Sequence, residues 1–534
     1  MSHGTLTANA APVVPSTAVV ETGSSALARR DDRARRAVWL LGAAVLSLAF
    51  TVQPFRDPDV WWHLAAGRLI TDHGIPSSEP FTFLGAPHQW IGQQWGYEVL
   101  LARLVDAGGA GLAMLVMGAV AAGALLVAAF ALPRHAAVPS WARAAAMLVS
   151  GLVFAQLVGV RGQVISLLGS ALVLLIVARW RDGSTRAPWL LVPLIAIWAN
   201  LHAGFVVGLG IPVIVAASVA VWRRVDRGSA PSASVRTLLL ATAVAAAAVM
   251  LNPAGPHLYS YVADTFANPT LTQGIVEWQS PSFHNTFLRL FEVEVVALVA
   301  LWALSRRPDP VDVVLGVGAV LISLQAQRNV AVFAVVAVPQ LARYGAMCWD
   351  RLGGGRGFAR PRRPAPTGLV VMLAAMVGAL TVIVDVVPAT RASATADYEA
   401  EHYPRAAADY VASHLKGQRL YSTYEWGGYL AYRFPNSRLV YIYGESAIFG
   451  SDRLNEYLQV HTLQPGWPDV LFRDGMNHAV VPASSQETTA LLELGWQALC
   501  YDNRGGAVVL GAPQTPGAVS PASLPPDVTQ ASSC

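Results

Sequence analysis

Two carboxylates stand two residues apart at Asp57 and Asp59, and His63 follows four residues after the second. Asp57 precedes Pro58, an arrangement typical of a helix start, and the spacing of four places Asp59 and His63 on one helix face. Such carboxylates can act as a general base, or they can hold a divalent cation that bridges to a phosphate. They can also simply cap the helix and complement its dipole, and the spacing alone favours this structural role.

The rest of this loop offers two further candidates for binding a substrate. Glu79 lies in a turn-rich segment and could orient an acceptor, although an exposed loop acid is the commoner case. Trp90 could line a sugar site, since aromatic faces suit sugar rings, but anchoring at a membrane interface explains it equally well.

Polar residues within or beside apolar runs form a second group of candidates. His202 interrupts a long apolar stretch, and such a break must face protein or a water-filled cavity. Arg328 lies at the edge of an apolar run and could pair with a lipid phosphate, as could Arg161 in a tight turn, whereas snorkelling to head groups is the structural alternative for both. Glu277 could face the first loop from a later segment.

Several classes of chemistry lack their sequence signature. No pair of histidines has a zinc spacing, and no Walker-type or dinucleotide-binding loop occurs. The basic residues lie mostly between apolar runs, so a pI near 9.0 does not indicate a nucleic-acid partner. Cys500 and Cys534 could pair if they face an oxidising compartment.

The elements that must position these residues are apolar helices. Of 534 residues 54% are hydrophobic and only 13% are charged, which is typical of a polytopic membrane protein. We predict about eleven spans and an interfacial helix in the outer loop 54–109, where Trp61, Trp62, Leu64 and Ile70 supply apolar bulk suited to the membrane interface. The predicted spans lie near 37–53, 110–132, 140–158, 163–180, 188–202, 203–222, 235–252, 291–304, 311–326, 329–345 and 366–386.

Charge and composition predict the orientation and the remaining domains. Five basic clusters fall on one side of the predicted spans, which indicates a cytoplasmic N-terminus in the plasma (inner) membrane. Segments 1–36 and 513–534 are predicted to be disordered tails, and 37–388 to be the bundle. Between 389 and 512, short β-like runs alternate with helical ones, which predicts an extracytoplasmic α/β domain. The clusters are Arg29–Arg36, Arg179–Arg186, Arg223–Arg227, Arg306–Arg307 and Arg351–Arg363.

The run Asp-Pro-Asp-x-Trp-Trp-His-Leu-x-x-Gly at 57–67 resembles the first outer loop of the GT-C glycosyltransferases. More closely, it is similar to a GT-C-like group of bacterial membrane proteins whose chemistry is mostly inferred from fold. Further segments resemble that group and read Trp-Ala-Asn-Leu-His (198–202), Leu-Asn-Pro-Ala-Gly (251–255), Glu-Trp-Gln-Ser-Pro (277–281), Arg-Asn (328–329) and Trp-Gly-Gly-Tyr-Leu (426–430).

The resemblance implies an enzyme that moves a sugar from a polyprenyl-phosphate-linked donor to a glycan, lipid or protein acceptor of the cell envelope. It makes Asp57 and Asp59 the expected catalytic residues or ligands of a Mg²⁺ or Mn²⁺ ion. His63, Glu79, Trp90, His202, Glu277 and Arg328 are then the expected substrate-binding residues. A transporter or flippase and a non-catalytic envelope scaffold remain as alternatives, although the sequence shows neither repeat symmetry nor many charges within spans.

Overall fold

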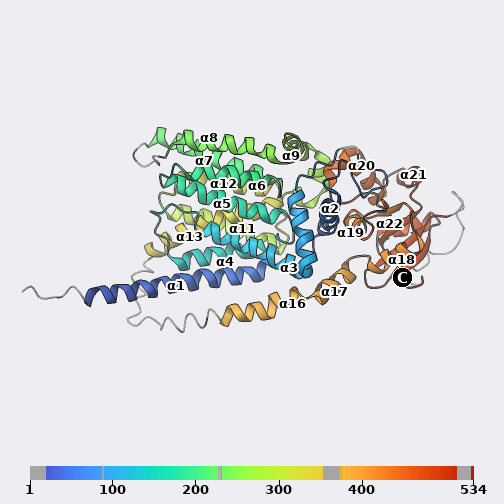
Figure 1. Cartoon of the computed structure of the whole chain (residues 1–534), viewed down its shortest axis with the longest axis horizontal. Coiled ribbons are helices and arrows are strands. Elements are labelled where there is room, and N and C mark those ends of the chain that lie inside the picture. The colour runs from blue at the N-terminus through green and yellow to red at the C-terminus, as the bar shows by residue number, and fades with distance from the viewer. Residues whose placement is uncertain are drawn as a thin grey trace, which may run out of the picture.

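A computed structural model describes residues 20–86, 89–155, 157–226, 228, 231, 233–352, 373, 376–513 and 531–534. It shows a bundle of long helices with a smaller mixed domain at one end (Figure 1). Most of the predicted tails, residues 1–19 and 514–530, lies outside the described residues, as does most of the basic cluster 351–363.

Four helices of the bundle are long and apolar enough to cross a membrane. They are α3 (Trp95–Ala129), α5 (Gln163–Arg181), α7 (Phe205–Val225) and the continuous helix 327–351, which comprises η4 (Gln327–Asn329) and α13 (Val330–Arg351). A fifth span results if Met376–Ala389 and Ala392–His402, bent by 50° at their junction, are taken together. The chain is therefore a multi-pass helical membrane protein, and the count of eleven spans stays a prediction.

The remaining predicted spans overlap other helices of the bundle. α1 begins at Val20, inside the segment predicted to be a disordered tail. These helices are α1 (Val20–Thr51), α4 (Ser140–Phe154), η1 (Ala187–Leu190), α6 (Leu191–Ala199), α8 (Val235–Ala248), η2 (Val249–Leu251), α11 (Thr286–Leu304), α12 (Pro310–Gln325), the π-helix η5 (Val382–Val386) and α16 (Val387–Ala389).

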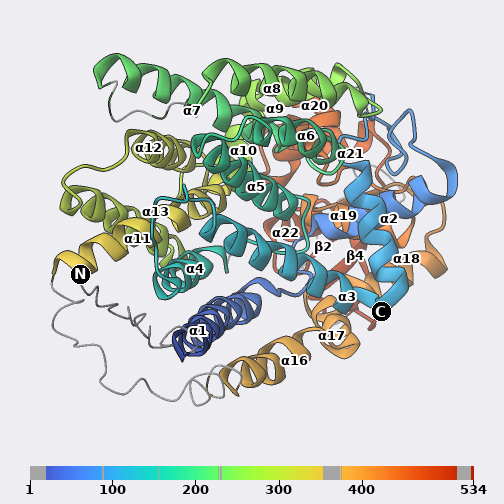
Figure 2. The same ribbon diagram turned by 60° about the vertical axis from the view of Figure 1, so that its left-hand side comes forward.

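The centre of the bundle is α13. Within the helix 327–351, 78% of the most apolar stretch is buried inside the protein. It packs against α3, α4, α5, α11 and α12, while α1 and α16 lie together on one side of the bundle (Figure 2). Because α13 is held from many sides, the cavity-lining residues near its first turn belong to a rigid frame.

The outer loop contains α2 (Asp59–His73), which begins after Pro58 as its sequence predicts. Its tryptophans are not membrane anchors, because Trp61 and Trp62 are 4% and 2% exposed inside the protein. The Trp61 ring lies 5.2 Å from Tyr429 of the C-terminal domain, and α2 is enclosed between α3 and that domain. The apolar side chains predicted to lie at the membrane interface instead join the two parts of the molecule.

The second outer segment, named for the orientation that the sequence predicts, consists of α9 (His257–Ala267), α10 (Pro269–Gly274) and η3 (Val276–Trp278). It is joined to the start of the 327–351 helix, since Gln327 donates its backbone N–H to Gln279 O at 2.9 Å and its side-chain amide to Val276 O at 2.8 Å. These bonds place η3 beside Arg328.

The C-terminal domain has a four-stranded sheet with order β1-β2-β4-β3, in which only the β1–β2 pair is parallel. The segment 438–443, a β-like run in the sequence, forms only isolated bridges, from Val440 to Thr82 and Leu420. A disulfide joins Cys500 and Cys534. The elements are α17 (Ala392–His402), α18 (Arg405–His414), β1 (Leu420–Ser422), α19 (Tyr424–Arg433), α20 (Ser446–His461), α21 (Trp467–Arg473), β2 (His478–Pro482), α22 (Gln486–Glu493), β3 (Gln497–Asp502) and β4 (Ala507–Gly511).

Candidate active site between the bundle and the C-terminal domain

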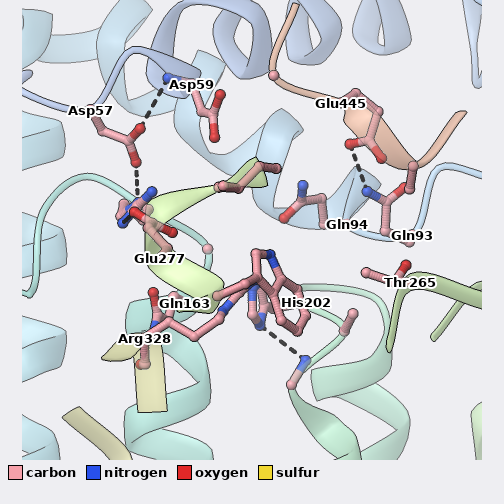
Figure 3. A pocket seen from close by; sticks show the side chains of 18 of the residues that line it. Asp57, Asp59, Gln93, Gln94, Gln163, His202, Thr265, Glu277, Arg328 and Glu445 are labelled. Carbon is pink, nitrogen blue, oxygen red and sulfur yellow. Dashed lines mark hydrogen bonds and ion pairs between the residues drawn. The ribbon is translucent and has the colours of Figure 1, made fainter. Parts of the chain in front are cut away.

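A cavity of about 520 Å³ lies where the bundle, the two outer segments and the C-terminal domain meet. The bundle contributes the turn before α5 and the break between α6 and α7, and the domain contributes the start of α19 and the inner face of α20. Figure 3 shows Asp57, Asp59, Glu277, His202, Arg328 and Glu445 arranged around this space. The cavity therefore unites residues that are hundreds of positions apart.

The Asp57 carboxylate makes two contacts at the start of α2. Its Oδ1 accepts the backbone N–H of Asp59 at 3.0 Å, which is the capping role expected from the sequence. Its Oδ2 forms an ion pair with the guanidinium of Arg161; the Asp57 side chain is 10% exposed and that of Arg161 is 25% exposed. A capping role alone does not require an arginine partner, so the second contact indicates a function for the charge.

Asp59 has a different environment, although it is two residues away. Its Oδ1 accepts a hydrogen bond from Trp62 Nε1 at 3.0 Å. Burial, reinforced by the nearby charge of Asp57, raises the pKa of Asp59 to about 6. A carboxylate with such a pKa is a stronger base than an ordinary aspartate and is still ionised at neutral pH.

His63 lies beside these acids, buried at the edge of the cavity. Its Nδ1 is 3.2 Å from Glu98 Oε1, and burial lowers the pKa of His63 to about 4 in spite of the neighbouring aspartates. His63 is thus neutral at physiological pH, so that it offers one hydrogen-bond donor and one acceptor.

Arg161 joins the first loop to the second outer segment. Besides Asp57 it contacts Glu277, with Nη1 2.6 Å from Oε1. Burial alone would lower the pKa of Arg161, but the charges of Asp57 and Glu277 raise it, and the arginine in turn lowers the pKa of Glu277 against the effect of burial. Arg161 and Glu277 are therefore both charged at neutral pH.

Arg328 lies on the same side of the cavity without an ion pair to any described residue. Its guanidinium stacks over Trp278 with 4.4 Å between Cζ and the ring centroid, and its backbone carbonyl accepts from Gln163 Nε2 at 2.7 Å. The stacking fixes the plane of the guanidinium and leaves its N–H groups available for an anionic ligand.

His202 lies at the break between α6 and α7 that the sequence predicts. Its Nδ1 is 2.7 Å from Ser166 Oγ, and this oxygen accepts a hydrogen bond from Trp198 Nε1 at 2.8 Å. Gly204 permits this packing, because a Cβ there would stand 2.2 Å from Ser166 Oγ. The break in the helix thus faces the cavity, as irregular backbone at membrane depth requires.

The cavity contains most of the predicted site residues. Asp57, Asp59, His63, His202, Glu277 and Arg328 all line it. Two others do not. The Glu79 carboxylate accepts hydrogen bonds from Phe81 N, Thr82 N and Thr82 Oγ1, so it stabilises its own turn, and Trp90 packs against Phe81 in the core.

Sequence reasoning also left several lining residues outside the predicted site. The sequence marks Arg161 only as an arginine in a tight turn that could pair with a lipid phosphate or snorkel to head groups. Glu445 was not singled out, yet its carboxylate accepts from Gln93 Nε2 and from Tyr261 OH, both at 2.9 Å. No local pattern marks Tyr424 or Tyr457, which join the cavity only through the fold of the domain.

The donor set does not fit a resident divalent cation. Among the residues that the structure describes, no three His, Cys, Asp or Glu side chains gather closely enough to hold a metal ion. The positive charge next to Asp57 is already supplied by Arg161, and Asp59 is bound by an indole N–H. Asp57 and Asp59 therefore do not form a ligand set for a divalent cation.

The chain matches no protein-family model, and no curated protein is similar to it. Among solved structures it is similar to the apo oligosaccharyltransferase of Archaeoglobus fulgidus, at 13% identity and a TM-score of 0.47, covering 84% of this chain and 69% of that one. It is also similar to ArnT from Cupriavidus metallidurans bound to undecaprenyl phosphate, at 14% identity and a TM-score of 0.45, covering 92% and 99%.

A third similar structure is the Archaeoglobus fulgidus oligosaccharyltransferase AglB in complex with an inhibitory peptide and a dolichol-phosphate, at 12% identity and a TM-score of 0.40, covering 89% of this chain and 74% of that one. Because these TM-scores are below 0.5, the function proposed below rests on the cavity.

Proposed function

We propose that this protein is a membrane glycosyltransferase that moves a sugar from a polyprenyl-phosphate-linked donor to an acceptor hydroxyl at the outer face of the membrane. The observation that carries the proposal is the cavity itself. It combines a basic carboxylate, Asp59, with two partly buried arginines, Arg161 and Arg328, at the end of an apolar bundle. Sugar transfer from a lipid phosphate needs a base for the acceptor and cations for the departing phosphate.

The arginine side of the cavity suits a lipid-linked phosphate. A second cavity of about 250 Å³ shares Arg161, Glu277 and Arg328 with the main one. Its other walls come from α4, α11 and the start of α13, and they combine apolar side chains with polar ones; the apolar side chains are Val153, Leu157, Phe287, Leu288 and Val330, and the polar ones are Gln163, Asn285 and Gln327. A phosphate bound by the guanidinium of Arg328 could therefore keep its hydrocarbon chain on the apolar side of the same arginines.

Asp59 is the better candidate for the base, and Asp57 for a positioning residue. Asp57 is already engaged by the guanidinium of Arg161 and by the backbone N–H of Asp59, whereas the pKa of Asp59 is raised to about 6. In the proposed step the acceptor oxygen attacks the anomeric carbon and its proton passes to the Asp59 carboxylate. The bond from that carbon to the phosphate oxygen breaks, and its electron pair leaves with the phosphate towards Arg328.

The test measures undecaprenyl phosphate, the product common to all undecaprenyl-phosphate-linked sugar donors. Purified protein in lipid nanodiscs is incubated with a panel of such hexose and pentose donors and with envelope extract as the source of acceptor. We expect release of undecaprenyl phosphate that depends on the extract and declines as the pH falls through about 6, because protonated Asp59 cannot accept a proton. Absence of release with every donor, or release that is unchanged between pH 7 and 5, contradicts the proposal.

A further inference from the structure

The half of the cavity formed by the C-terminal domain has its own chemical character. We propose that this half, the acceptor arm (Tyr424, Glu425, Glu445, Leu454, Tyr457 and His461), binds the uncharged end of a glycan. The proposal rests on the proposed transferase function and adds the chemical class of its acceptor: a neutral sugar, as opposed to a phosphorylated or acidic one.

Two tyrosines form a fixed wall of the acceptor arm. Tyr457 OH accepts the backbone N–H of Tyr424 at 3.0 Å, and Tyr424 OH donates to the Gly444 carbonyl at 3.0 Å. The Tyr457 ring also stacks on His461 with centroids 5.4 Å apart. Rings held in this way can pack against the C–H face of a sugar without losing conformational freedom on binding.

The arginines of the cavity lie in only one of its halves. Arg161 and Arg328 are both on the bundle side, together with Asp57, Asp59 and Glu277, whereas the arm presents the carboxylates Glu425 and Glu445. His461 adds no excess positive charge, because its Nδ1 is 2.5 Å from Glu487 Oε1. An anionic ligand can therefore meet an arginine in the bundle half, whereas in the acceptor arm it meets carboxylates.

This combination of rings and carboxylates matches the groups of a neutral sugar. Sugar hydroxyls donate hydrogen bonds, and ionised carboxylates accept them strongly. Glu445 is held in place by Gln93 and Tyr261, and burial raises its pKa to about 7, so near neutral pH it can accept a hydrogen bond from a hydroxyl or donate one; Glu425 is exposed. A uronic acid or a sugar phosphate would place a like charge next to Glu425, and next to Glu445 whenever that group is ionised.

The arm ends beside the proposed base. The backbone at Gly444 lies so close to Asp59 that a Cβ at this glycine would stand 1.8 Å from Asp59 Oδ1 and 2.7 Å from Trp62 Nε1. A sugar ring between Tyr424, Tyr457 and Glu445 would therefore have a hydroxyl within reach of the carboxylate that must remove its proton.

The experiment compares neutral and acidic trisaccharides of equal size. Binding to the full-length protein in lipid nanodiscs is measured by calorimetry, since maltoside detergents would themselves present sugar. The neutral probes are trisaccharides of glucose, mannose, galactose or arabinose, and the acidic probe is trigalacturonic acid. We expect at least one neutral probe to bind at least ~10-fold more tightly than the acidic probe, because carboxylate repulsion falls only on the latter.

Charge reversal in the arm sharpens the test. Glu425→Lys is expected to reverse the preference towards trigalacturonic acid, whereas Glu493→Lys, an exposed charge outside the cavity on α22, should leave it unchanged. The inference is overturned if no neutral probe binds, if both classes bind equally, or if Glu425→Lys has no effect on the preference.

A separate titration distinguishes failure of the inference from failure of the transferase function. Undecaprenyl phosphate is titrated into the wild type and Glu425→Lys, and both should bind it with equal affinity because Glu425 lies in the other half. Binding of undecaprenyl phosphate without any sugar preference contradicts only the acceptor class. Sugar preference without undecaprenyl phosphate binding contradicts the proposed function, and with it the description of the arm as an acceptor site.

Discussion

Two clusters of arginines and acidic residues lie at opposite ends of the bundle, and they differ in whether their charges balance. In the inner cluster Arg181 and Arg343 each contact both Asp309 and Asp312, and the four side chains are 5–17% exposed. Tyr344 closes it by donating to Asp312 at 2.8 Å and accepting the N–H of Asp309 at 2.9 Å. Two positive charges meet two negative ones within a packed interior.

The outer cluster has unequal partners and lines a cavity. Arg161 contacts two acids, Asp57 and Glu277, while Asp59 has an indole N–H as its partner and Arg328 an aromatic ring. The Arg328 guanidinium and the Asp59 carboxylate are thus available to bind a ligand. The comparison teaches that a buried charge indicates a functional site only where its neighbours do not already neutralise it.

The largest expected effect is on transfer by the outer cluster. Asp59→Asn keeps the size of the side chain but removes the base, so transfer should fall roughly 10²–10⁴-fold while the melting temperature changes little. Asp72→Asn, an exposed acid on the same helix, is the matched control. Release of undecaprenyl phosphate and thermal stability are measured on both, and an active Asp59→Asn protein would remove the distinction between the clusters.

In the inner cluster the same change should act on folding. Asp309→Asn leaves Arg181 and Arg343 with one carboxylate, and removing one partner of a buried ion pair costs about 3–5 kcal/mol. We expect a lower melting temperature in detergent and normal transfer per folded molecule, with Asp350→Asn on the exposed end of α13 as the control. Lost transfer in protein of normal stability would mean that the inner cluster is functional as well.

A smaller effect on transfer is expected from the backbone contact that supports Asp59. A Cβ in Gly444→Ala would stand 1.8 Å from Asp59 Oδ1, so the base must move, and a displacement of about 1 Å can cost roughly 100-fold in rate. Gly318→Ala, where no atom lies within 4 Å, is the control. The rate of transfer should fall while undecaprenyl phosphate still binds; an unchanged rate would show that the domain does not position Asp59.

The smallest expected effect concerns Arg328. Arg328→Lys retains the charge but loses the planar stacking on Trp278 and the fork of donors, which should weaken undecaprenyl phosphate binding roughly fivefold. Calorimetric titration in nanodiscs measures the affinity, and Arg56→Lys on the exposed outer loop is the control. Equal affinity in wild type and Arg328→Lys would assign Arg328 to the structural charges, like those of the inner cluster.

The sequence predicted the start of α2 and the break near His202 because both depend on local chemistry. Asp before Pro favours a helix start wherever it occurs, and polar residues inside an apolar run must turn towards protein or water. The same reasoning misjudged Trp61 and Trp62. An apolar helix face can be covered by lipid or by protein, and nothing local distinguishes the two.

By itself, the sequence determined that the chain is a helical membrane protein and that Asp57 and Asp59 begin the helix of its first outer loop. Apolar length and helix-start signals are properties of contiguous residues, so no partner is needed to read them. Only the tertiary structure decided which charges neutralise one another. Arg161 meets Asp57, and Gly444 meets Asp59, through contacts between residues that are about 100 and nearly 400 positions apart, and such pairing leaves no periodic signal along the chain.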